Sequence, residues 1–187
     1  MTNSVPERVI SRKEIYRGRI LALEVDEVVL PNGRKTTREI VRHPGAVVIV
    51  AVDDRGRVAM VRQYRAAIGR ELLELPAGTR EPNESAERCA ERELAEEMGV
   101  AATKWTSLGG FYSSPGFCTE YLALFLATGL FPSDGHPEVD ESISREWVEL
   151  NAVPTMIAAG DICDAKSIAG MYRCLHGLTA GEWSWRS

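Results

Sequence analysis

The most informative part of the chain is Gly78–Val100, which reads GTREPNESAERCAERELAEEMGV. Between positions 79 and 97 it holds seven glutamates and three arginines, a net charge of −4 within a chain whose formal charge is −5. Residues 84–98 are mostly Glu, Ala and Arg, which favour helix, and Gly99 follows where a glycine commonly ends one. We therefore predict a helix over residues 84–98 that carries an excess of carboxylates.

These carboxylates are spaced to gather on one side of the predicted helix. Glu93 and Glu97 are four residues apart and share a face, and Glu96 lies beside them. Mutual repulsion would destabilise such a face, and hard divalent cations relieve it by binding oxygen ligands. Arg92 is four residues before Glu96 and eight after Glu84, so it can hold carboxylates by forked pairs. The spacing indicates a cation site, although most Glu-rich helix faces are simply solvated.

The stretch resembles the Nudix box, the signature of the Nudix hydrolases. That box is Gly, five residues, Glu, seven residues, Arg-Glu-aliphatic, one residue, Glu-Glu, one residue, Gly-aliphatic. Every fixed position is matched, by Gly78, Glu84, Arg92, Glu93, Leu94, Glu96, Glu97, Gly99 and Val100. The resemblance implies an α+β fold, an α/β/α sandwich with a mixed central sheet flanked by helices. It also implies hydrolysis of a nucleoside diphosphate linked to another group, with Mg²⁺ or Mn²⁺.

Roles follow from the resemblance residue by residue. Glu93 and Glu97 would be the main metal ligands, with Glu96 a further ligand or a support behind them. The carbonyl of Ala77 would add a backbone ligand, and Arg92 would orient the carboxylates. Two to three ions per site would neutralise the diphosphate and activate a water. Glu96 and Arg92 are accordingly expected to be catalytic residues.

Other segments are similar to the ADP-ribose pyrophosphatase branch of the family. They are Ser114-Pro115-Gly116, which begins 14 residues after Val100, Glu120 in the same segment, Arg62-Gln63-Tyr64-Arg65 and Glu74–Gly78. The resemblance implies a substrate-binding role for Arg65, more weakly for Arg38, and for Ser114, Pro115 and Glu120. Taken alone, Ser-Pro-Gly is typical of a turn and either arginine of a surface charge.

The expected substrate is thus a nucleotide sugar, most simply ADP-ribose, cleaved to AMP and ribose 5-phosphate. GDP-mannose is the main rival inside the family. Oxidised nucleotides and dinucleoside polyphosphates are others. A sensor that binds a nucleotide sugar without cleaving it is a different class, and the intact box argues against it.

The general base is expected on the acidic loop 133–142, SDGHPEVDES. Glu141 immediately precedes a strand-like segment, which fits the family pattern best, and Glu138 is the alternative. A loop glutamate can swing in when metal and substrate are bound. The segment is also compatible with an ordinary acidic surface loop, and His136 within it is more often inert.

The rest of the chain reads as strands, then helices. A hairpin is expected over 19–42 around Pro31-Asn32-Gly33. Further strands are expected at 46–52, 58–64, 72–75, 105–109, 121–127 and 145–149 and helices at 153–160 and 165–177, with one principal sheet. Pro44-Gly45 suggests a boundary between an N-terminal β element, 1–44, and the hydrolase domain, 45–187. The resemblance implies that this N-terminal element takes part in forming a homodimer.

Composition excludes several classes of protein. A net charge of −5 argues against a nucleic-acid binder. The longest apolar runs fall short of the roughly 20 residues that a membrane helix needs, and the N-terminus lacks the apolar stretch of a signal peptide. Four irregularly spaced cysteines predict reduced thiols rather than a zinc site. We expect a cytoplasmic enzyme with no nucleic-acid or membrane partner.

Overall fold

The computed structural model describes residues 7–135 and 143–185. The chain forms two compact units. The first comprises Met1–Gly45 and Tyr112–Tyr121, and the second comprises Ala46–Phe111 and Leu122–Ser187. The chain therefore leaves the second unit between Phe111 and Leu122 to contribute a short segment to the first.

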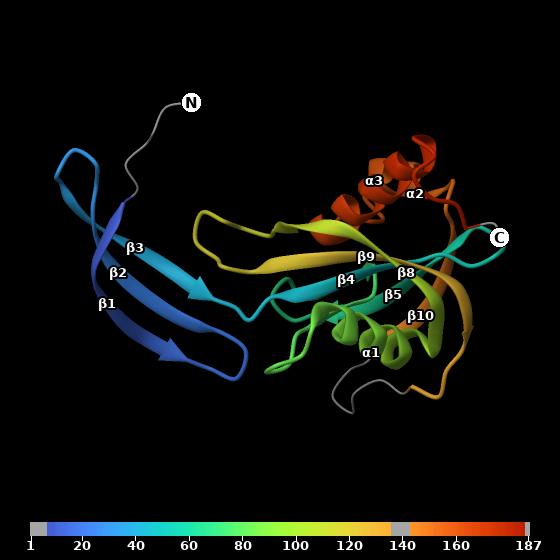
Figure 1. Ribbon diagram of the computed structural model, residues 1–187, viewed down its shortest axis with the longest axis horizontal. Helices are drawn as coiled ribbons and strands as arrows, with labels where there is room; N and C mark the ends of the chain where they lie inside the picture. The colour runs from blue at the N-terminus through green and yellow to red at the C-terminus, as the bar shows by residue number, and fades with distance from the viewer. Residues whose placement is uncertain (1–6, 136–142, 186–187) are drawn as a thin grey trace. The chain divides into compact units, whose positions relative to one another are not determined.

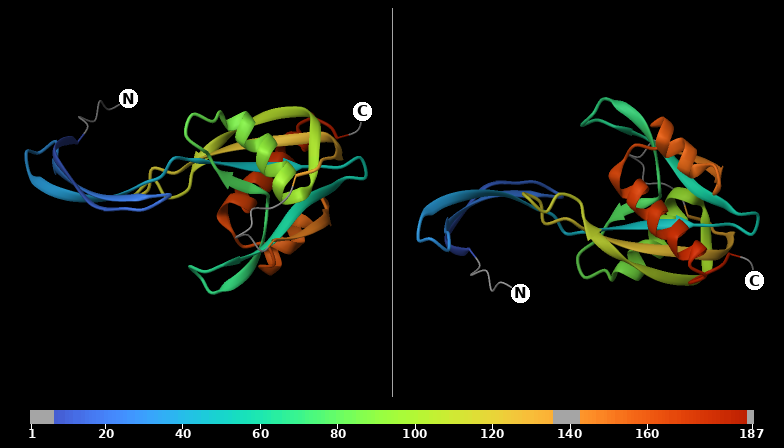
Figure 2. Two further views of the ribbon diagram at one scale, coloured as in Figure 1. Left: turned by 90° about the horizontal axis from the view of Figure 1, so that it is seen from below. Right: turned by 90° about the horizontal axis from the view of Figure 1, so that it is seen from above.

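The first unit is built on a three-stranded antiparallel sheet, which Figure 2 shows as a curved ribbon. Its order is β1 (Arg8–Arg17), β2 (Ala22–Val29) and β3 (Lys35–Arg42). The sequence predicted only the hairpin of β2 and β3. Strand β1 was missed because five of its ten residues, RVISRKEIYR, are charged and nearly all are exposed, so no apolar alternation marks it.

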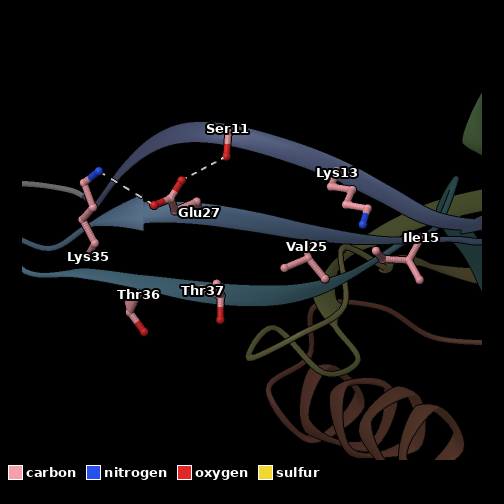
Figure 3. A pocket seen from close by; sticks show the side chains of 8 residues that line it. All are labelled: Ser11, Lys13, Ile15, Val25, Glu27, Lys35, Thr36 and Thr37. Carbon is pink, nitrogen blue, oxygen red and sulfur yellow. Dashed lines mark hydrogen bonds and ion pairs between the residues drawn. The ribbon is translucent and has the colours of Figure 1, made fainter.

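The two faces of this sheet differ. On one, Asp26 is buried and accepts from Arg12 Nε and Nη2 at 2.8 and 2.9 Å, while Arg42 Nε donates to Glu24 at 2.7 Å. The other face carries an open hollow of ≈ 580 Å³, and in Figure 3 Glu27 joins β1 to β3 across it. It is lined by Ser11, Lys13, Ile15, Val25, Glu27, Lys35, Thr36 and Thr37.

The segment 112–121 is attached to β3 by backbone hydrogen bonds. Val41 donates to the Phe117 carbonyl at 2.7 Å, and Thr119 donates to the Val41 carbonyl at 3.0 Å. The Ser114 carbonyl accepts from the Phe117 and Cys118 amides at 3.1 and 2.8 Å, which closes a tight turn. The Ser-Pro-Gly motif is therefore a turn that belongs to the N-terminal unit.

The second unit contains two sheets where the sequence predicted one principal sheet. The four-stranded sheet has the order β7-β4-β9-β8, and β10-β5-β6 form the other. The four-stranded sheet is mixed, because β4 pairs parallel with β9 and antiparallel with β7. The strands are β4 (Ala46–Ala51), β5 (Arg57–Arg65), β6 (Arg70–Glu74), β7 (Ala77–Thr79), β8 (Val100–Tyr112), β9 (Tyr121–Pro132) and β10 (Ile143–Glu149).

Strand β4 separates two halves of the core. All six of its residues are buried, which explains its unbroken apolar and mostly β-branched sequence. Its even positions, such as Val50, pack with the helices α2 (Val153–Ala159) and α3 (Ala165–Thr179). Its odd positions, such as Ile49, pack with the helix α1 (Ala86–Met98). Figure 1 shows α1 on one side of these strands and α2 and α3 on the other, so the predicted α/β/α sandwich is confirmed.

Helix α1 begins and ends as its sequence predicts, within two residues. Ser85 is the N-cap, and its hydroxyl accepts from the Arg88 amide at 3.2 Å. Gly99 adopts a left-handed conformation, φ 67°, and donates to the Ala95 carbonyl at 2.9 Å.

In the described part of the chain, no helix is long and apolar enough to cross a membrane.

Candidate active site

The two carboxylates predicted to share a face of α1 do so, and the strand β7 lies against them. Glu97 is 2 % exposed, and its Oε2 accepts from the Ala77 amide at 3.1 Å. Glu93 is 8 % exposed and packs directly on Gly78, where an added Cβ would lie 1.7 Å from Glu93 Oε1. Glycine is therefore required at the start of the box, because any side chain there would displace a carboxylate.

Arg92 lies at the centre of the acidic side chains. Its Nε and Nη2 donate to the two carboxylate oxygens of Glu84 at 2.9 and 3.0 Å. Its Nη1 donates to Glu93 at 2.8 Å and to Glu96 at 3.0 Å. The two contacts expected from spacing, to Glu84 and Glu96, are present, and Glu93 is an additional one. One guanidinium therefore fixes three carboxylates at once.

The ion pair between Arg92 and Glu84 stabilises the charged form of both groups. The hydrogen bond from Arg92 lowers the pKa of Glu84 to about 2, and the same bond raises the pKa of Arg92 above its ordinary value. Burial raises the pKa of the Cys89 thiol, whose sulfur lies 3.8 Å from the Gly78 carbonyl, to about 12. The thiol is thus neutral, and the charges beside it belong to the arginine and the glutamates.

Arg145 on β10 is a part of this arrangement that the sequence analysis did not identify. Its Nε donates to the Glu97 carbonyl at 2.7 Å and its Nη2 to the Glu96 carbonyl at 3.1 Å. These are carbonyls of the last turn of α1, which has no basic residue of its own. Arg145 is 48 positions from Glu97, so spacing within the helix could not reveal it.

Arg65, the cationic residue that was expected to bind the substrate, lies at the end of β5 and forms an ion pair. Its Nε and Nη2 donate to the carboxylate of Glu74 at 2.9 and 2.5 Å. Glu74 is 1 % exposed and is also bound by the ammonium group of Lys166. Burial alone would raise the pKa of Glu74, but the hydrogen bonds and charges of these two cations lower it. Neither the pairing of Arg65 with Glu74 nor the contact of Lys166 with Glu74 was predicted.

Four of the expected substrate residues lie in the first unit. The guanidinium of Arg38 donates to Glu7 at 3.0 and 2.5 Å. Ser114 and Pro115 form the turn described above, and Pro115 is exposed. Glu120 lies 3.6 Å from the Nδ1 of His43, which also accepts from the Gly45 amide. The structure therefore places these four residues on the N-terminal unit and the box on the second.

Both candidates for the general base, Glu141 and Glu138, lie outside the described residues, as does His136.

The donor atoms at the box fit a hard divalent cation. Among the residues that the structure describes, the oxygen donors there are carboxylates on one face of α1 and the backbone of β7, and the nearby Cys89 thiol is neutral and therefore a poor ligand. Among residues 7–135 and 143–185, no group of three or more His, Cys, Asp or Glu is already arranged to hold an ion. Mg²⁺ does not need such a cage, because it keeps several waters and commonly binds one or two carboxylates together with substrate phosphates.

Comparison with known proteins identifies the family of this chain. The NUDIX domain model matches residues 41–169, and a model of the nucleoside diphosphate sugar hydrolase N-terminal domain matches residues 7–41. The chain is 40% identical to the ADP-ribose pyrophosphatase of Bacillus subtilis over 166 residues, 88% of this chain and 90% of that protein. It is also 40% identical to the ADP-ribose pyrophosphatase of Mycobacterium tuberculosis, over 92% of this chain and 84% of that protein.

A solved structure titled "Crystal structure of ADP compounds hydrolase" has the same fold, with a TM-score of 0.86 over 97% of this chain and 98% of that one, at 20% identity. The chain belongs to the Nudix family. It is a Nudix pyrophosphatase, and Nudix hydrolases generally use divalent metals.

Proposed function

We propose that this protein hydrolyses ADP-ribose to AMP and ribose 5-phosphate with Mg²⁺ bound at the box. The observation that carries the proposal is the joint burial of Glu93 and Glu97 against the Ala77-Gly78 backbone. The choice of ADP-ribose is supported by the two relatives of that name, each 40% identical over most of the chain.

In this proposal, Glu93 and Glu97 hold the metal, with Glu96 and the carbonyl of Ala77 as further ligands, for two to three ions in all. Mn²⁺ would be accepted as well as Mg²⁺. When bound, the metal neutralises the diphosphate and lowers the pKa of an attacking water. Arg92 contributes by fixing the directions of the carboxylates that face the substrate.

The proposed reaction consumes one water. Its oxygen bonds to one phosphorus, the bridging P–O bond of the diphosphate breaks, and the two halves leave as AMP and ribose 5-phosphate. A loop glutamate takes the proton of the water, Glu141 in the first instance and Glu138 otherwise. Arg65 is proposed to bind a phosphate, and Arg38, Ser114, Pro115 and Glu120 are proposed as further substrate-binding residues.

A substrate panel tests the proposed function. The full chain is incubated with Mg²⁺ and, separately, ADP-ribose, GDP-mannose, NADH, diadenosine polyphosphates and 8-oxo-dGTP, and products are separated by ion-exchange chromatography. We expect the highest kcat/KM for ADP-ribose, with AMP as product. A higher value for GDP-mannose would replace the proposed substrate. Tight binding of ADP-ribose without AMP release would instead indicate a sensor.

We also propose that two chains associate through the N-terminal sheet. The proposal is supported by apolar side chains on or beside β1 that are about half exposed, namely Val9, Ile15, Tyr16 and Ile20. Deletion of residues 1–44 is expected to convert a dimer into a monomer or an insoluble protein. Analytical ultracentrifugation would measure this, and an unchanged, active dimer after deletion would contradict the proposal.

A further inference from the structure

The ion cluster of Arg65, Glu74 and Lys166 contains two cations and one buried carboxylate. Arg65 already pairs with both carboxylate oxygens of Glu74 as a fork, which neutralises its single negative charge. Lys166 nevertheless brings a second cation to Glu74 Oε2. With Lys166, the three groups carry a net charge of +1 instead of zero.

The carboxylate of Asp164 is also near Lys166, but it caps the N-terminus of α3. It lies 3.2 Å from the ammonium nitrogen, and it accepts from the Lys166 and Ser167 amides at 3.0 and 3.2 Å as the N-cap of α3. The orphan amides and the positive end of the helix dipole compensate much of its charge. Glu74 is the shorter contact of the Lys166 ammonium group, so Lys166 is counted with Glu74 and Asp164 with the N-terminus of α3.

Arg65 is the member of the cluster that faces outward. Its side chain is 39% exposed, whereas those of Lys166 and Glu74 are 15% and 2% exposed. Only its Nε and Nη2 donate to Glu74, so among residues 7–135 and 143–185 the Nη1 group is left for another acceptor. Besides Glu74, the carboxylates of Glu97 and Asp164 also act on Arg65 electrostatically.

The cluster is also rigidly joined to the chain that leads into the box. The residue after Glu74, Leu75, donates from its amide to the buried hydroxyl of Ser167 at 2.7 Å. The Pro76 carbonyl then accepts from the Ile49 amide at 2.9 Å. Helix α3 and strand β4 therefore hold the segment that carries Glu74 in place.

From this arrangement we propose that Lys166 is a positioning residue that neutralises Glu74, so that Arg65 keeps its full charge for a phosphate of the substrate. The inference rests on the proposed role of Arg65. Without Lys166, Arg65 and Glu74 would form a neutral pair with little attraction for an anion. Lys166 itself touches no substrate, and its effect passes through Glu74.

The variant Lys166→Met tests this, because it removes the charge and keeps most of the stem. We expect KM for the best substrate of the panel to rise about tenfold, the scale of one unit charge acting over several ångströms near a protein surface, with kcat within about twofold of wild type. KM should also increase less steeply with salt. The matched control is Lys104→Met, the same change at an exposed position on β8.

The double variant Lys166→Met/Glu74→Gln separates charge from structure. It restores the net charge of +1, so we expect its KM to return close to that of wild type. The single variant Glu74→Gln, with a charge of +2, should not exceed the wild-type KM. An unchanged KM in Lys166→Met, or a KM in the double variant as high as in Lys166→Met, would overturn the proposal.

The outcome is independent of which nucleotide sugar is preferred. If ADP-ribose is not cleaved, the same variants are measured with the substrate that is. If Arg65→Gln leaves KM unchanged while Lys166→Met raises it, Arg65 is not the phosphate-binding cation, and the proposal for Lys166 is overturned with it. Thermal unfolding of each variant identifies any that loses its fold, and the Glu74→Gln background keeps the comparison possible if Lys166→Met alone is unstable.

Discussion

Glu97→Gln is expected to lower kcat by at least about 100-fold, the scale of losing one preorganised group that stabilises transition-state charge. The side chain is 2 % exposed and is the most buried carboxylate of the box. A glutamine oxygen can still accept the hydrogen bond from the Ala77 amide, now 3.1 Å long. The fold should therefore survive while the negative charge that binds the metal is lost.

The matched control for Glu97→Gln is Glu91→Gln, the same change at an exposed position of α1. Steady-state kinetics at saturating Mg²⁺ and substrate would measure kcat for both variants, and thermal unfolding would compare their stabilities. The control should match wild type in both. Near-normal turnover by Glu97→Gln would remove this residue from the metal site.

Gly78→Ala is the second change with a large expected effect. Its new methyl group would occupy the position now taken by the Glu93 carboxylate, 1.7 Å from Oε1. The end of a glutamate side chain moves readily, so the protein should still fold. The carboxylate, however, must shift by more than 1 Å, and a misplacement of that size can cost about 100-fold in rate. We expect kcat to fall on that scale.

Gly116→Ala is the control for Gly78→Ala, because nothing lies within 4 Å of an added Cβ at Gly116. Circular dichroism and thermal unfolding should leave both variants close to wild type, and only Gly78→Ala should lose activity. A Gly78→Ala protein that is fully active would show that the position of Glu93 does not matter. One that is unfolded would show that Gly78 is needed for folding instead.

The parts of the site that lie close together in the chain were predictable from the sequence. The spacing of Glu93 and Glu97 places them on one face of α1 whatever the rest of the fold, and Gly99 ends the helix for reasons of backbone conformation. The buried run Ala46–Ala51 likewise identified the central strand. Within a helix or a strand, the local periodicity of the sequence is enough to predict which side chains share a face and which are buried.

Contacts between distant segments were not predictable in this way. Lys166 meets Glu74 across 92 positions, and Arg145 reaches the carbonyl of Glu97 across 48. Each is an ordinary charged residue in its own segment, and only the packing of the elements on β4 brings it to its partner. Strand β1 could not be predicted from the sequence for a related reason. Because it is exposed on both faces, its sequence needs no alternation of apolar and polar residues.

The central claim is that the carboxylates of α1, set against the backbone of Ala77 and Gly78, bind divalent ions. Isothermal titration calorimetry with Mg²⁺ and Mn²⁺ tests it most directly, on the wild-type chain and on Glu93→Gln/Glu97→Gln, each with a non-hydrolysable methylene analogue of ADP-ribose present. We predict clear uptake by wild type and a loss of most of that uptake in the double variant. No uptake by wild type, or equal uptake by both proteins, would contradict the claim.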